Sequence, residues 1–111
     1  MKAYGIARVG EIAPHPEIGE YLRRIDETLA PFEGRFLVHA SPFQVVEGDW
    51  PAGGVIIIEF PDSEAARAWY ASDAYQAILP FRTRHIQMDV ILAEGVPEPY
   101  SAAETADKLG F

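Results

Sequence analysis

The segment Val55–Phe60 constrains the fold more than any other part of the sequence, because it is apolar at almost every position. A β-branched run of this length, ended by Pro61, is typical of a strand. Both of its faces are apolar, and so are those of Val90–Ala93 near the end of the chain. Strands of this kind need cover on both sides. The sequence therefore predicts a sheet with neither face left to water.

The rest of the pattern places this strand in a β-α-β-β-α-β order. Apolar residues at steps of three, four and seven predict an amphipathic helix over Pro16–Phe32, stopped by Gly34. A second helical segment begins near Ser63, breaks at Ser72-Asp73 and is closed by Pro80. The other predicted strands are Ala3–Val9, Arg35–Ala40, with room to resume as Phe43–Glu47, and Ile86–Ala93.

This order predicts the α+β ferredoxin-like fold, a four-stranded antiparallel sheet with two helices on one face. Residues 1–96 form this domain, and residues 97–111 form a C-terminal tail in which Ser101-x-x-Glu104 predicts a capped short helix. A chain of 111 residues cannot supply a second helical layer. We therefore expect a homodimer whose sheets pack together as a dimeric α/β barrel. The alternative is that the tail folds over the free face.

Composition narrows the classes of partner and cofactor. The net charge of −8 argues against nucleic acid and against anionic membranes. The lack of cysteine excludes disulfides, thiol nucleophiles and thiolate metal sites. The three histidines have no metal-ligand spacing, and no glycine-rich phosphate loop follows a strand, so we predict neither metal nor cofactor. No apolar run suggests a signal peptide or a membrane span, and the cytoplasm is the expected location.

Several motifs in order resemble the domain-of-unknown-function 1330 family over roughly residues 3–96. The resemblance implies a dimeric α/β barrel, in a superfamily that includes cofactor-free monooxygenases, polyketide cyclases, chlorite-dismutase-like heme proteins, and small decarboxylases or dehydratases. It implies no established activity for the family itself. The sequence departs from the family pattern at Glu33-Gly34, where Gly-Gly is usual, and at His39, where arginine is common. The matching motifs are Gly34-Arg35-Phe36-Leu37-Val38, Glu47-Gly48-Asp49-Trp50, Glu59-Phe60, Ala66–Tyr70 with Ser72 and Tyr75, and Arg82.

Strand alternation predicts a group of polar residues on the sheet face that is directed toward the partner. His39 is the candidate general acid or base, with Glu59 orienting it or sharing its proton. Arg35 is the candidate for stabilising an oxyanion, and Asp89 lies on the same predicted face. The alternative is that these residues form a hydrogen-bonded network in a filled interface. On the opposite, helix-facing side we expect Phe36 and Val38, then Ile56, Ile58 and Phe60, then Ile86, Met88, Val90 and Leu92.

Three further features are candidates for ligand contact. Arg82 begins a local positive cluster with Arg84 and His85, which either binds a substrate carboxylate or pairs with the chain's own acids. Tyr75, with Trp69 and Tyr70, either stacks on an aromatic ligand or fills the core. Trp50 lies on a predicted hairpin connection and is a candidate anchor for the partner.

Two hypotheses about function follow from these features. The first is a cofactor-free enzyme, or a binder, that takes a small acidic or aromatic metabolite in the barrel cleft, with a pocket of at least roughly 300 Å³ per protomer. The second is a non-catalytic dimeric domain that serves binding or regulation. The sequence names no substrate and does not decide whether the protein is an enzyme.

Overall fold

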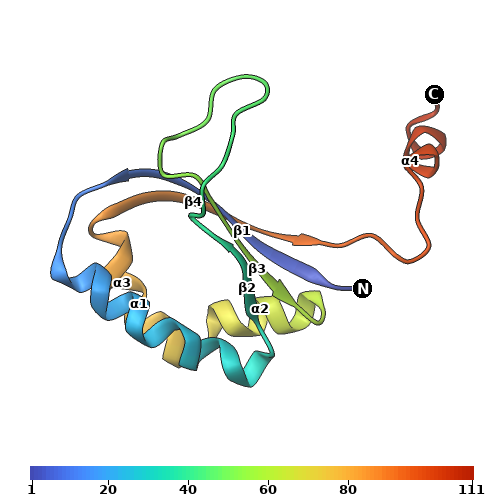
Figure 1. Cartoon of the computed structure of the whole chain (residues 1–111). Coiled ribbons are helices and arrows are strands. Elements are labelled where there is room, and N and C mark those ends of the chain that lie inside the picture. The colour runs from blue at the N-terminus through green and yellow to red at the C-terminus, as the bar shows by residue number, and fades with distance from the viewer.

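The computed structural model describes residues 1–111 as a four-stranded antiparallel sheet with helices on one face (Figure 1). The strand order is β2-β3-β1-β4, so the α+β topology is the predicted ferredoxin-like one. The second helical segment breaks at Ser72-Asp73, as predicted, and so forms two helices. The elements are β1 (Ala3–Ile12), α1 (Pro16–Leu29), β2 (Arg35–His39), β3 (Val55–Phe60), α2 (Ser63–Ala71), α3 (Asp73–Thr83), β4 (Ile86–Glu94) and α4 (Ala102–Leu109), with a 3-10 turn at Ala30–Phe32.

The main core lies between the sheet and α1, α2 and α3. Phe60, Leu29 and Ile78 are its largest fully buried side chains, and they come from β3, α1 and α3. Gly34 is needed for this packing, since a Cβ there would lie 2.8 Å from side-chain atoms of Leu29 and of Phe60. The predicted helix stop is therefore a close-approach glycine. The left-handed turn that ends the preceding 3-10 turn is made one residue earlier, by Glu33.

Helix α3 corrects the prediction that Pro80 closes the second helical segment. The Ser72 hydroxyl caps α3 by accepting the Tyr75 backbone N–H at 3.3 Å, and the helix continues through Pro80 to Thr83. Pro80 is exposed, so the carbonyl left without its helical N–H partner is on the water side. The extra turn matters because it places Arg82 four residues after Ile78 and seven after Tyr75, on the buried face of α3.

Strand β2 contains a β-bulge that corrects the predicted faces of its residues. Phe36 pairs with Ile58 and Val38 pairs with Ile57, so Leu37 is an extra residue. His39 therefore lies on the same side as Phe36, and the two rings stack with centroids 4.3 Å apart. The prediction that His39 faces away from the helices is wrong, and so is the prediction that Val38 faces them, because the extra residue breaks the alternation.

The predicted continuation of this strand over Phe43–Glu47 is also wrong. No strand forms between β2 and β3, and residues 40–54 make a long loop that rises above the sheet (Figure 1). Ala40 adopts a left-handed backbone conformation (φ 48°), while its N–H still bonds the Val55 carbonyl at 3.0 Å. This turn directs the chain away from the sheet immediately after His39.

The second face of the sheet has no layer on it, and we call it the open face. The C-terminal tail leads away from the sheet instead of folding over it (Figure 1). Ile91, on the open face of β4, is 58% exposed. Helix α4 forms as predicted, but Ser101 makes no side-chain capping bond. None of the helices is both long enough and apolar enough to cross a bilayer.

Candidate functional site

A cavity of about 200 Å³ lies between the sheet and the helices, and we call it the covered pocket. Its walls are almost entirely apolar, and no acidic residue lines it. The polar side chains that reach it are Arg82 and Tyr75 of α3, Tyr21 of α1, and His39 at the end of β2. The apolar part of the wall is formed by Ala7, Val9 and Ile12 of β1, Ile18, Leu22 and Ile25 of α1, Phe36, Ala40, Ile56, Ile58 and Trp69, and Ile86, Met88 and Val90 of β4.

Arg82 is the unusual member of this group, because it is a buried charge without an acidic partner. The residue is only 5% exposed, and no carboxylate lies within ion-pair distance of its guanidinium. Its Nε is buried and has no hydrogen-bond partner. Burial works against the charge, but the hydroxyls of Tyr75 and Tyr21 outweigh it and raise the pKa of Arg82. Arg82 therefore brings one fixed positive charge to the pocket.

The hydroxyls of Tyr21 and Tyr75 lie 2.8 Å apart beside this charge. Burial, followed by the neighbouring Tyr75, raises the pKa of Tyr21, so the Tyr21 phenol stays protonated. The two hydroxyls carry two protons, and their mutual hydrogen bond uses one of them. One O–H proton is left to donate. Arg82 and the tyrosine pair together place N–H and O–H donors side by side with no carboxylate among them, which is an arrangement that suits an anion.

Trp69 packs against the tyrosine pair and is itself held by a hydrogen bond. The Trp69 indole donates to the Thr28 hydroxyl at 3.0 Å, and that hydroxyl donates to the Ile25 carbonyl at 2.6 Å. The Trp69 ring centroid is 4.1 Å from that of Tyr75. Trp69 and Tyr75 are thus buried parts of the core and also form a wall of the pocket.

His39 lies at the rim of the covered pocket, where its side chain is exposed and rests on Phe36. Neither imidazole nitrogen takes part in a hydrogen bond or an ion pair. Glu59 does not orient it, because Glu59 faces the opposite side of the sheet. The structure therefore separates the predicted pair His39 and Glu59.

The other predicted residues gather on the open side. Glu59 Oε1 lies 2.9 Å from Lys2 Nζ and 3.0 Å from the Arg35 guanidinium. The hydrogen bonds from Lys2 and then Arg35 lower the pKa of Glu59. Asp89 is exposed on β4, opposite Arg8 in the strand register. Trp50 is 47% exposed on the long loop, with the Arg8 guanidinium 5.9 Å from its ring centroid.

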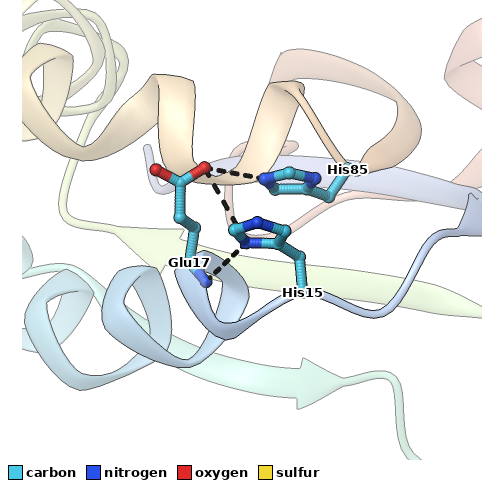
Figure 2. Close-up of side chains that lie close together, drawn as sticks. All are labelled: His15, Glu17 and His85. Carbon is cyan, nitrogen blue, oxygen red and sulfur yellow. Dashed lines mark hydrogen bonds and ion pairs between the residues drawn. The ribbon is translucent and has the colours of Figure 1, made fainter.

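A second polar cluster joins the start of α1 to the end of α3 (Figure 2). His85 Nε2 lies 2.7 Å from Glu17 Oε1, and Arg84 donates to Glu17 Oε2 at 3.2 Å. The imidazoles of His15 and His85 are stacked, with centroids 4.0 Å apart and planes within 6°. The pKa of Glu17 is lowered, and its hydrogen bond to His85 is the largest cause. Arg84 and His85 thus pair with the chain's own acid, as one of the two interpretations predicts, and Arg82 is not part of that cluster.

Two histidines and a carboxylate have the composition of a metal site, but the arrangement fits a hydrogen-bonded cluster better. An ion must lie near the plane of each imidazole that binds it, and two parallel stacked rings do not share such a point. His15 Nδ1 already accepts the backbone N–H of Glu17 at 3.0 Å. Arg84 and the positive end of α1 add charge that repels a cation.

One known protein family has a model that matches most of this chain. Residues 2–96 match the model of a family described as Domain of unknown function (DUF1330). No functionally curated protein matches the sequence.

Solved structures resemble the chain in fold. A protein of unknown function from Rhodopseudomonas palustris has a TM-score of 0.64 at 14% identity, over 86% of this chain and 83% of that one. A dimeric ferredoxin-like protein of unknown function from Jannaschia sp. CCS1 has a TM-score of 0.61 at 15% identity, over 86% and 100%. SnoaB from Streptomyces nogalater, a cofactor-independent oxygenase, has a TM-score of 0.59 at 16% identity, over 89% and 98%. At these identities the similarity extends to the fold alone.

Proposed function

Since the chain belongs to the DUF1330 family, whose function is unknown, we propose a function from its own residues: each protomer binds a small aromatic monoanion in the covered pocket. One observation carries the proposal. Arg82 is buried, has no acidic partner, and opens onto an apolar cavity. A buried charge left alone is strongly destabilising, whereas an anionic ligand would neutralise it. The proposed site therefore lies inside one protomer, whereas the sequence predicted a site in the cleft between two protomers.

The size and lining of the pocket narrow the class of ligand. The volume of about 200 Å³ is below the 300 Å³ expected from the sequence, so the pocket suits a single ring rather than a fused ring system. Apolar and aromatic walls suit the ring. Arg82 supplies one positive charge, and no acidic side chain lines the pocket to bind a cation. A benzoate-sized carboxylate or phenolate meets these conditions.

The chemistry that the pocket offers is proton transfer without a cofactor. We propose that His39 accepts a proton from the ligand, and that Arg82 with the free tyrosine O–H stabilises the oxyanion that forms. A sufficiently electron-rich phenolate transfers an electron to dioxygen, so dioxygen from solution would be the oxidant and would be reduced as the bound ring is oxidised. The fold similarity to SnoaB, a cofactor-independent oxygenase, supports this direction. Glu59 takes no part, since it faces the other side of the sheet and is already paired.

We also propose that the open face binds a second copy of the chain. Ile6, Ile57 and Ile91 of three adjacent strands form an apolar row across it. The Arg35–Glu59–Lys2 group and the Arg8–Asp89 pair would then border the interface, and Trp50 would lie beside it. The similar fold of a dimeric ferredoxin-like protein supports this assembly. The pocket is complete within one protomer, so binding does not depend on the dimer.

Fluorescence of Trp69 tests the ligand proposal. Trp50 is the only other tryptophan, so Trp50→Phe leaves Trp69 as the sole reporter in the pocket. Benzoate and 4-hydroxybenzoate should quench it saturably, and neutral benzamide should bind at least ~10-fold more weakly, because charge-assisted bonds are the stronger ones. Arg67→Gln, which removes an exposed charge of α2 outside the pocket, is the matched control and should bind like the parent protein. Equal binding of benzoate and benzamide would contradict the proposal.

A second measurement separates an enzyme from a binder. Phenolic substrates that quench Trp69 are incubated in air while oxygen uptake and product formation are followed. We expect His39→Ala to keep ligand affinity within ~3-fold and to lower turnover by ~10²-fold, the scale of a lost general base. Turnover that is unchanged in His39→Ala would remove His39 from the mechanism, and binding without turnover would favour a binding or regulatory role.

A further inference from the structure

The His15–Glu17–His85 cluster lies at one end of the covered pocket and joins the two chain segments that form it. His15 and Glu17 begin α1, and His85 follows α3 (Figure 2). Their chain neighbours Ile18 and Ile86 line the pocket, as does Ile12 at the end of β1. Movement of α1 away from the start of β4 would therefore open this end of the pocket.

We propose that this cluster is a pH-operated latch, which holds the end of the pocket closed at neutral pH and releases it as the pH falls toward about 5.5. The claim that the latch regulates ligand exchange rests on the proposed function. The claim that the end of the pocket opens as the pH falls does not rest on it. The observation that carries it is the stacking of two imidazoles, one of which must be unprotonated for the latch to hold.

His15 is that imidazole. Its Nδ1 accepts the backbone N–H of Glu17 at 3.0 Å and thereby caps the N-terminus of α1. A proton on Nδ1 would remove the acceptor, leave a helix N–H unsatisfied, and add a positive charge to the positive end of the helix. Loss of this N-cap would lower the stability of the first turn of α1.

The remaining charges make a second proton still less favourable. The first proton on His85 strengthens its bond to Glu17, because that bond becomes an ion pair. A proton on His15 then puts two like charges in rings 4.0 Å apart. Arg84 adds a third positive charge at Glu17, and the other acid at this place, Glu11, lines the surface cleft beside Arg84 and His85. Three cations would thus face Glu17 and Glu11 in the acidified latch.

Hydrogen exchange measures the opening without any ligand. In the wild-type protein, we expect backbone amides of residues 17–20 and 84–86 to lose ~5- to 10-fold of their protection between pH 7.5 and 5.5, after correction for intrinsic exchange. The scale is modest because His15 is exposed and Glu17 is only partly buried. Amides of β3 are the internal reference and should not change.

The variant His15→Asn separates the latch from general acid loosening. Asparagine is a good N-cap and does not titrate, so α1 stays capped at both pH values. We expect its protection to be the same at pH 7.5 and 5.5. Equal losses in His15→Asn and wild type, or no loss in wild type, would overturn the latch.

Ligand kinetics test the regulatory part. Benzoate remains an anion at both pH values, and its association rate with the wild-type pocket should rise ~3- to 10-fold at pH 5.5 but stay constant in His15→Asn. The regulatory claim would be overturned if hydrogen exchange responded to pH but the benzoate association rate did not. Absence of any benzoate binding would overturn the proposed function and leave the exchange result to decide the latch.

Discussion

The two faces of the sheet each carry an arginine, and the two arginines are in opposite situations. On the open face, the side chain of Arg35 is 67% exposed and pairs with Glu59 at 3.0 Å. Under the other face, Arg82 is 5% exposed and has no acid near it. Because Arg35 is exposed to water and paired with Glu59, its charge costs the folded protein little free energy. Burial disfavours the charge of Arg82, Tyr75 and Tyr21 nevertheless raise its pKa, and its Nε remains unpaired.

This difference indicates how the two faces are used. A face whose carboxylate Glu59 is already paired, and which carries the apolar row of Ile6, Ile57 and Ile91, is suited to packing against another surface. A buried pocket whose only formal charge is unpaired is suited to a ligand of opposite sign. Under our proposal, the sheet thus separates an assembly surface on one face from a ligand site under the other, and each of the following predictions tests one part of that division.

The largest expected effect is on assembly. Ile57→Asp places a carboxylate in the middle of the open face, opposite Ile6. Burying that charge between two copies should raise the dimer dissociation constant by at least ~100-fold, as measured by sedimentation. Ala77→Asp, on the exposed side of α3, is the matched control and should leave the dimer unchanged. A wild-type monomer, or a dimer that survives Ile57→Asp, would show that this face is not the interface.

The second effect concerns the two arginines directly. Arg82→Met should weaken benzoate binding by ~10- to 100-fold and yet raise the free energy of unfolding by about 1 kcal/mol, because an apolar side chain replaces an unpaired buried charge. Arg35→Met should leave benzoate affinity unchanged. Titration and denaturant unfolding measure both quantities. If Arg82→Met unfolds the protein, the guanidinium is a structural element and not a ligand site.

A smaller effect is expected at the turn that follows His39. Ala40 has a positive φ, which glycine adopts without penalty, so Ala40→Gly should stabilise the protein by ~0.5–1 kcal/mol. The melting temperature reports the gain. Gln44→Gly, in the same exposed loop, is the control and should give no gain. Destabilisation by Ala40→Gly would contradict the conformation that positions His39 at the pocket.

The smallest expected effect is on the pH dependence of the melting temperature. The pKa of Glu59 is lowered in the folded protein, so its contribution is present above the unfolded value near 4.5 and is lost as the pH falls through the folded value. The melting temperature of Glu59→Gln should therefore fall less steeply than that of the wild type between pH 5 and 3. Benzoate affinity at pH 7 should not change. Parallel melting curves would mean that the Lys2 and Arg35 contacts add nothing to stability.

Most of the architecture could be predicted from local pattern. The apolar run of β3 and the helical spacing of α1 give the element order, and the order gives the topology. The site could not be predicted in the same way, because its geometry depends on exceptions to the pattern. Leu37 is an ordinary apolar strand residue, and nothing local announces that it is the extra residue of a bulge that turns His39 toward the helices.

Two other features of the site were hidden for different physical reasons. Pro80 usually ends a helix, and only the spacing of Tyr75, Ile78 and Arg82 could have indicated that α3 continues with Arg82 on its buried face. His15 and His85 lie far apart in the chain. Their stacking is fixed by tertiary packing, which no short-range spacing reports.

The most direct test of the central claim is the side-chain resonance of the Arg82 Nε–H group in a ¹H–¹⁵N NMR titration. This proton has no acceptor in the ligand-free protein. Saturating benzoate should move the resonance downfield as a carboxylate oxygen becomes its partner, while the resonance of Arg35 stays in place and benzamide has no such effect. An Arg82 Nε–H signal that benzoate leaves unchanged would contradict the account.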